Sequence, residues 1–166
     1  RENRAVLADR IYRAMVAAGS NTQRVPVTAF DWRVAPVILP PREDETKETL
    51  TARLRDPAVH TSRRCQAALQ LAYRSRLAHP LELTCLSFGD AARVLHLPGE
   101  SFMEYQHFAH SLHPSTWMAV ASYADCGPGY VCMETSHAEG GYEPTDTYVS
   151  PECEAIMKAG IRKLLA

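Results

Sequence analysis

The sequence predicts an α/β fold, a mixed sheet with a β-hairpin and a βαβ crossover, flanked by helices. Two strand-like runs, 81–88 and 91–97, are joined by Gly89-Asp90, a Gly-X pair typical of a tight hairpin. A helical pattern and another apolar run, 117–123, follow, which predicts two parallel strands joined by a right-handed crossover. Amphipathic segments at both ends of the chain provide helical layers.

Length and composition favour one domain, residues 1–166, because 166 residues with 46% apolar content can bury one core. The 18 basic and 19 acidic residues leave a net charge of -1, which disfavours nucleic acid as a partner. No run approaches the roughly 20 apolar residues of a transmembrane helix. The chain opens on Arg1, without methionine, inside an amphipathic pattern, so we expect a piece of a longer polypeptide.

The first segments predict a helix and an edge strand. Apolar residues recur at helical spacing over 2–18, and Gly19 is expected to cap this helix, whose role is packing. Apolar residues then alternate over 25–34 with a change of phase, which indicates a bulge or bend before Pro36. Prolines at positions 26 and 36 favour an edge position, since proline cannot donate to a ladder.

Helical patterns fill the middle of the chain. A short helix around Leu50 and a longer one over 65–72 are separated by Asp56-Pro57, and His79-Pro80 closes the pair. We expect a helical layer here. Buried small apolar residues are the favoured interpretation of three cysteines, Cys65, Cys85 and Cys153.

The C-terminal half is expected to alternate between regular and irregular structure. A helix over 102–112 leads to a buried strand over 117–123. Residues 124–149 are rich in Gly, Pro, Asp and Thr without a period, so they are either disordered or functional. From Ser150-Pro151 onward, one apolar stripe predicts a helix that docks on the core.

Candidate site residues follow the ends of two predicted parallel strands, where ligands collect in open α/β sheets. Glu100 comes directly after Leu97-Pro98-Gly99, and Tyr130 and Tyr142 each follow a glycine in the 124–142 loop. A phenol can ligate a metal or donate to an oxyanion. The alternatives are that Glu100 only caps its helix and that both rings only hold the loop on the core.

These motifs resemble those of the neutral/alkaline non-lysosomal ceramidase family. The matching residues are Leu97-Pro98-Gly99-Glu100, Gly129-Tyr130-Val131 and Tyr142-Glu143, the last pair beginning twelve residues after Tyr130. The resemblance is strongest over 87–143 and includes the ending Gly-Gly-Tyr-Glu-Pro. It departs where the family has Phe-Thr-Thr after the glutamate and Thr-Thr after Tyr-Val, because this chain has Ser-Phe-Met and Cys-Met.

The resemblance implies that the chain is the C-terminal portion of a ceramidase-like catalytic domain, a zinc-dependent amide hydrolase. Zinc would be held by Glu100, by Tyr130 and by two histidines from the missing N-terminal part of the polypeptide. Tyr142 would stabilise the tetrahedral transition state. The substrate would be a small-molecule or lipid amide, the family context slightly favours a secreted or periplasmic location, and this fragment alone should bind zinc poorly and be inactive.

Two other functions remain open from the sequence. One is a non-catalytic lipid- or glycan-binding or structural module derived from the same fold. The other uses Cys126 or Cys132 as a nucleophile with His137 nearby. The pair Glu134 and His137 and the evenly spaced histidines at 107, 110 and 113 are interpreted as solvated surface, and His96 as a partner that orients Glu100.

Overall fold

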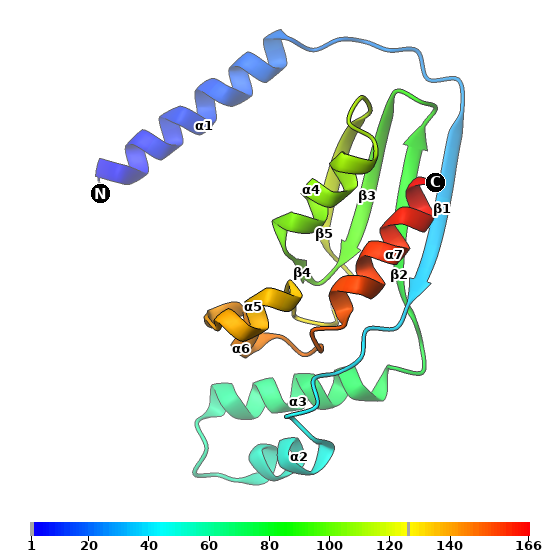
Figure 1. Ribbon diagram of the computed structural model, residues 1–166. Helices are drawn as coiled ribbons and strands as arrows, with labels where there is room; N and C mark the ends of the chain where they lie inside the picture. The colour runs from blue at the N-terminus through cyan, green and yellow to red at the C-terminus, as the bar shows by residue number, and fades with distance from the viewer. Residues whose placement is uncertain (1, 126) are drawn as a thin grey trace.

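The computed structural model describes residues 2–125 and 127–166 and has the predicted class, a mixed α/β fold in which a four-stranded mixed sheet is flanked by helices (Figure 1). Its elements in chain order are α1 (Glu2–Ser20), β1 (Phe30–Val37), α2 (Lys47–Arg55), α3 (Thr61–Ser75), β2 (Leu81–Phe88), β3 (Ala92–Pro98), β4 (Glu100–Ser101), α4 (Met103–Leu112), β5 (Trp117–Ala124), β6 (Tyr130–Val131), α5 (Glu134–Glu139), α6 (Tyr142–Asp146) and α7 (Cys153–Leu165).

The strand order of the large sheet is β1-β2-β3-β5. β1 and β3 each pair antiparallel with β2, whereas β3 and β5 are parallel and are connected through α4. The predicted hairpin and crossover are therefore confirmed. The hairpin loop is one residue longer than predicted, because Phe88 pairs with Ala92 across residues 89–91. Gly89 adopts a φ of +55° there, a conformation that favours glycine.

The core lies between the sheet and the helices α4 and α7, which lie against the same face (Figure 1). α7 buries the predicted apolar stripe, which comprises Cys153, Met157, Gly160, Ile161, Leu164 and Leu165. Gly160 allows a close approach, since a Cβ there would lie 3.0 Å from Leu83 and 3.2 Å from Val37. This face of the sheet and α7 thus form the packed centre of the protein.

The opposite face of the sheet carries exposed aromatic rings. Phe30, Trp32 and Trp117 are 69%, 55% and 64% exposed, and the ring of Phe30 meets that of Phe88 edge to face, with ring centroids 5.5 Å apart.

The strand β5 is not the buried strand that was expected. It forms an edge of the sheet, and only Met118 among its residues is buried.

β1 is an edge strand, as its prolines predicted. The expected bulge is absent between Phe30 and Val37, because the register with β2 is continuous and includes the pair Pro36 and Glu82. The strand also begins later than predicted, after the alternating residues at 25–29. The change of phase in the sequence reflects this late start.

The N-terminal helix forms but has a different role from the one predicted. α1 runs to Ser20, and its stripe residues Leu7, Ile11 and Met15 are 52–69% exposed, so the packing role was wrong. Figure 1 shows it extending away from the sheet. No helix in the described ranges combines the length and apolar character that crossing a membrane requires.

The predicted helical layer consists of α2 and α3, which pack against each other beside one end of the sheet (Figure 1). Thr46 begins α2 by accepting a hydrogen bond from the Thr49 amide at 3.2 Å. One expectation for this layer was wrong, because the thiol of Cys65 is exposed, whereas Cys85 and Cys153 are buried as expected. The layer thus contributes polar surface as well as core.

Candidate functional site

The candidate site lies where β3 ends and a second, two-stranded sheet begins. β4 and β6 pair in parallel, and Glu100 and Tyr130 are direct register partners. The Glu100 amide donates to the Gly129 carbonyl at 2.8 Å, and the Phe102 amide donates to the Val131 carbonyl at 3.3 Å. Residues 30 positions apart in the sequence are thereby fixed side by side.

Two glycines make this pairing sterically feasible. Gly99 and Gly129 adopt φ values of +59° and +66°, in the left-handed region. A Cβ on Gly99 would overlap the carbonyl oxygen of Gly129 and the ring of Pro128. A side chain at position 99 would clash with the loop that carries Tyr130. Glycine at this position therefore lets the chain pass from β3 to Glu100 in close contact with that loop.

The side chains of Glu100 and Tyr130 interact directly. Their hydrogen bond, together with partial burial and the carboxylate charge, raises the pKa of the Tyr130 phenol to about 12. The phenol is therefore protonated at neutral pH and donates to the carboxylate. The sequence predicted that these two groups converge, and the geometry brings them together.

Tyr123 is a residue of this site that the sequence reasoning missed. Its hydroxyl donates to Glu100 Oε2 at 3.1 Å, and this bond raises the pKa of the phenol. The backbone of Tyr123 has a φ of +67°, which is uncommon outside glycine, and its amide donates to the Gly99 carbonyl at 2.7 Å. The available signal was its position at the end of the predicted 117–123 strand, beside the turn after β3.

Tyr142 lies next to Tyr130 rather than on the core. The two ring centroids are 5.9 Å apart with an interplanar angle of 77°, an edge-to-face contact. Tyr142 is 65% exposed, and a hydrogen bond to Asp146 raises the pKa of its phenol. One carboxylate, Glu100, thus has three phenols in its vicinity.

A cavity of about 470 Å³ adjoins these groups. Glu100, Tyr123 and the backbone of Gly129 line one part of it, and α3 supplies an apolar part through Leu69 and Ala72. An apolar pocket with a few convergent polar groups is the usual form of a small-molecule site. The arrangement can therefore hold an apolar ligand with a polar group next to Glu100.

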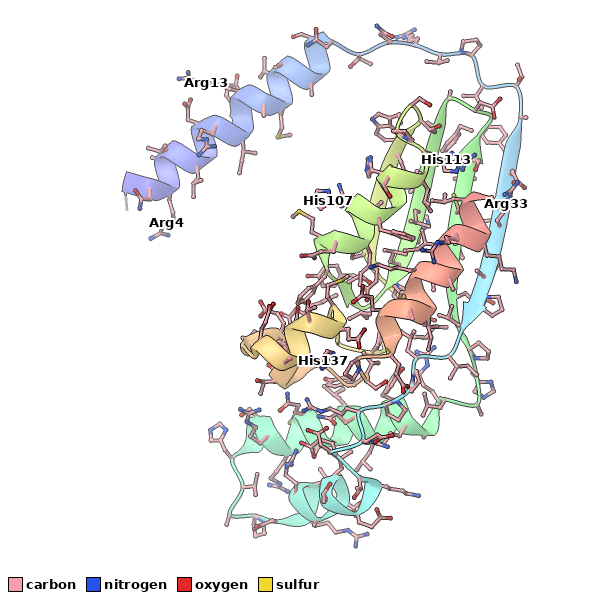
Figure 2. All side chains as sticks on the ribbon, in the orientation of Figure 1. Arg4, Arg13, Arg33, His107, His113 and His137 are labelled. Carbon is pink, nitrogen blue, oxygen red and sulfur yellow. The ribbon has the colours of Figure 1, made fainter. Side chains whose placement is uncertain are left out.

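The histidines of the chain lie elsewhere. Figure 2 shows His107 on α4, His113 directly after the end of α4, and His137 on α5. His113 contacts the Leu165 carbonyl at 2.7 Å. The expected role of His96 was wrong, since its Nδ1 lies 3.2 Å from Thr84 Oγ1 and its ring faces Trp32 at 6.0 Å, on the sheet face and not at Glu100.

The interpretation of Cys132 as a nucleophile is wrong. Its thiol is buried, and burial raises the pKa to about 11, which disfavours the reactive thiolate. His137, its suggested base, has a pKa lowered by burial and a buried Nε2 atom without a hydrogen-bond partner among the described residues. Cys126, the other candidate, lies outside the described residues.

The donor set fits part of a zinc site. Glu100 and Tyr130 present carboxylate and phenol oxygens side by side, and zinc in proteins takes four ligands of nitrogen, oxygen or sulfur. Across residues 2–125 and 127–166, no group of three or more His, Cys, Asp or Glu side chains could hold a metal ion. The described residues thus offer, in Glu100 and Tyr130, two oxygen donors of the kind that zinc accepts.

Comparisons with known proteins give a likeness in fold. No protein-family profile matches the sequence, and no curated protein matches it. A solved structure, neutral ceramidase from Pseudomonas aeruginosa, matches with a TM-score of 0.50 and 16% sequence identity. The match covers 89% of this chain and 29% of the ceramidase chain, so this chain spans less than a third of that protein. The fold is therefore ceramidase-like.

Proposed function

We propose that this chain contributes Glu100, Tyr130 and Tyr142 to the active site of a zinc-dependent amide hydrolase with a ceramidase-like fold. The observation that carries the proposal is the register pairing of Glu100 with Tyr130, whose side chains are hydrogen-bonded. Strand pairing fixes both backbones, so the two oxygen donors are held without a loop having to close. Two histidines from a preceding part of the polypeptide would complete the ligand set.

The chemistry divides among the residues of the site. Glu100 and Tyr130 would hold zinc, which when bound acts as a Lewis acid toward an amide carbonyl and lowers the pKa of water. Tyr142 is exposed and keeps its proton, so it can donate a hydrogen bond to the oxygen on which negative charge develops. Tyr123 holds Oε2 of Glu100 and thereby limits the rotation of the carboxylate.

The substrate proposed is a small-molecule or lipid amide. The cavity beside Glu100 supports this choice, since Leu69 and Ala72 offer apolar surface next to the polar groups. An acyl chain that covered this surface would remove apolar area from water on both sides of the contact, which favours its binding there. The scissile amide would then lie toward Glu100 and Tyr142.

The test measures zinc content and amide hydrolysis in the complete polypeptide that carries this chain. Glu100→Ala and Tyr130→Phe are expected to lower bound zinc, whereas Tyr142→Phe keeps zinc and lowers kcat by roughly 10²–10³-fold, as loss of an oxyanion donor does. Tyr12→Phe, on the exposed helix α1, is the matched control. Unchanged zinc content in both Glu100→Ala and Tyr130→Phe would refute the proposal.

A second candidate is a binding module without turnover. The apolar part of the cavity favours it, because such a surface can hold a lipid whether or not a metal is present. Retention of a lipid amide by the complete polypeptide, with neither zinc nor hydrolysis, is the result expected for this function.

A further inference from the structure

A second cavity, of about 390 Å³, lies between α2, α3 and the start of the segment that follows β1. Neither Glu100 nor Tyr130 lines it. Its lining residues are Arg42, Glu45, Arg53, Val59, Arg63, Gln66, Gln70 and Thr145. The surrounding segment 42–76 holds eight of the 18 Lys and Arg residues but five of the 19 Asp and Glu residues, so it is the basic part of a nearly neutral chain.

Two arginines of this cavity, Arg53 and Arg63, use only some of their guanidinium N–H groups in hydrogen bonds to the described residues. Arg53 donates through Nη1 to Glu45 at 2.8 Å, and Arg63 donates through Nη1 to Gln66 at 2.9 Å. Within the ranges that the structure describes, neither uses its Nε or Nη2 atoms. An unused Nε and Nη2 edge is the geometry that binds a carboxylate or phosphate through two parallel bonds.

Arg42 has a different role. It donates to both carboxylate oxygens of Asp44, each at 2.6 Å, and to the carbonyl of Pro144 at 3.1 Å. These contacts tie the segment after β1 to α6. Arg42 therefore builds the wall of the cavity, and Arg53 and Arg63 are the groups available to a ligand.

One buried polar atom in the same cavity has no partner among the described residues, and a nearly buried amide lines the cavity beside it. The amide is that of Gln70, which is 3% exposed. The unpartnered atom is Oε2 of Glu45, which is buried. Because a buried polar atom without a hydrogen bond is unfavourable, a ligand that donates to Oε2 would be favoured there.

We infer that this cavity binds an oxyanion, a carboxylate or phosphate, carried by a polar group that also has an N–H or O–H donor. Arg53 and Arg63 hold the oxyanion, the Gln70 amide donates to it, and Oε2 of Glu45 accepts from the adjacent donor. The donor requirement follows from Glu45, since a bare anion would be repelled by that carboxylate.

The cavity is linked to the candidate active site through Asp146. Asp146 accepts a hydrogen bond from Gln66, lies 3.7 Å from Arg63, and is hydrogen-bonded to Tyr142. A ligand that draws Arg63 away changes the partners of Asp146. If the proposed hydrolase function holds, occupancy of this cavity would therefore alter how Tyr142 is held, although ligand binding itself does not depend on that function.

Calorimetry on the full chain with inorganic sulfate, which carries no N–H or O–H donor, and with phosphoethanolamine tests the inference. We expect phosphoethanolamine to bind several-fold more tightly than sulfate, and Glu45→Gln to remove that difference. Arg53→Gln and Arg63→Gln are each expected to weaken phosphoethanolamine binding by about tenfold or more, as loss of a charge-assisted pair does. Arg55→Gln is the matched control, because Arg55 is exposed in the same last turn of α2.

Each result of these binding measurements either supports the inference or overturns it. Absence of binding of either probe, or equal weakening by Arg55→Gln and Arg53→Gln, would overturn the inference, the latter by showing only general attraction to basic surface. Gln70→Leu provides a second variant that removes a ligand contact without leaving a cavity, and circular dichroism checks that each variant is folded. Zinc content and hydrolysis are measured separately, so failure of the hydrolase proposal leaves this test intact.

Discussion

Glu100 and Tyr130 are paired residues of a two-strand parallel sheet that continues from the end of β3. Their backbones are joined because the Glu100 amide donates to the carbonyl of the residue before Tyr130, at 2.8 Å. Their side chains also share a hydrogen bond. A carboxylate and a phenol are thus held together by the fold itself before any ligand binds.

Replacement of the Glu100 carboxylate by an amide should lower the pKa of Tyr130. In the metal-free protein this pKa is about 12, raised by the bond to Glu100 above a usual value of about 10. The stability that this bond contributes is present below about pH 10 and is lost as pH rises through about 12. In Glu100→Gln the phenol should therefore ionise at lower pH, which a ¹³C NMR titration of tyrosine measures.

The control for this titration is Glu104→Gln, an exposed carboxylate in the first turn of α4. It removes the same charge from a nearby residue without removing the hydrogen bond. An equal change in the Tyr130 titration in both variants would contradict a direct bond and indicate only general electrostatics.

Gly99→Ala should destabilise the protein by more than about 3 kcal/mol. The substitution combines a left-handed backbone conformation, which costs about 1–2 kcal/mol for residues with a Cβ, with a clash against the Gly129 carbonyl. Gly89→Ala is the matched comparison, because Gly89 has a similar φ of +55° and open space around its Cα. Urea unfolding of both variants measures the difference, and equal losses would mean that the close approach at Gly99 has no energetic weight.

Alkylation should discriminate sharply among the cysteines. Burial raises the pKa of Cys132 to about 11 and that of Cys153 to about 12, so at pH 8 only about one Cys132 thiol in a thousand is ionised. Cys65 is exposed and should react first with iodoacetamide. Mass spectrometry after chymotryptic cleavage at Tyr130 isolates the peptide with Cys132. Rapid native-state labelling of that peptide would reopen the nucleophile hypothesis.

Truncation of α7 at its core face should have a large effect on stability. Ile161 is fully buried against the sheet, and Ile161→Ala is expected to lower the free energy of unfolding by about 2–5 kcal/mol. Ile11→Ala on α1 is the same chemical change at a side chain that is 60% exposed, and about 0.5 kcal/mol or less is expected. Thermal unfolding followed by circular dichroism compares the two, and similar losses would show that α1 packs on the core in solution.

Local patterns determined which parts of the fold could be predicted. The hairpin turn at Gly89 and the apolar stripe of α7 are short-range signals, and both elements formed as expected. Burial was predicted less well, because it depends on which neighbours a strand acquires. β5 is apolar yet lies at the sheet edge, and the stripe of α1 has the pattern of a packing helix yet is exposed.

The candidate site likewise contains residues that the sequence indicated and residues that it did not. Glu100 could be named because it follows a glycine at the end of a predicted strand, and Tyr130 because it follows a glycine in the 124–142 loop. Their roles came from the resemblance to the ceramidase family. Tyr123 was missed although it ends the predicted 117–123 strand, because its role also depends on a left-handed backbone conformation that a non-glycine residue does not announce in the sequence. His96 was misplaced because its partners, Thr84 and Trp32, come from neighbouring strands, and the register that brings them together cannot be read from the sequence around His96.

Pro36 limits how copies of this protein can associate. It lies within β1 at the outer edge of the sheet, and a prolyl nitrogen has no hydrogen to offer a fifth strand. Growth of the sheet by strand addition, the first step toward fibrous aggregation, is therefore interrupted at this border. Replacing Pro36 by a residue with an amide hydrogen would remove a built-in safeguard of solubility.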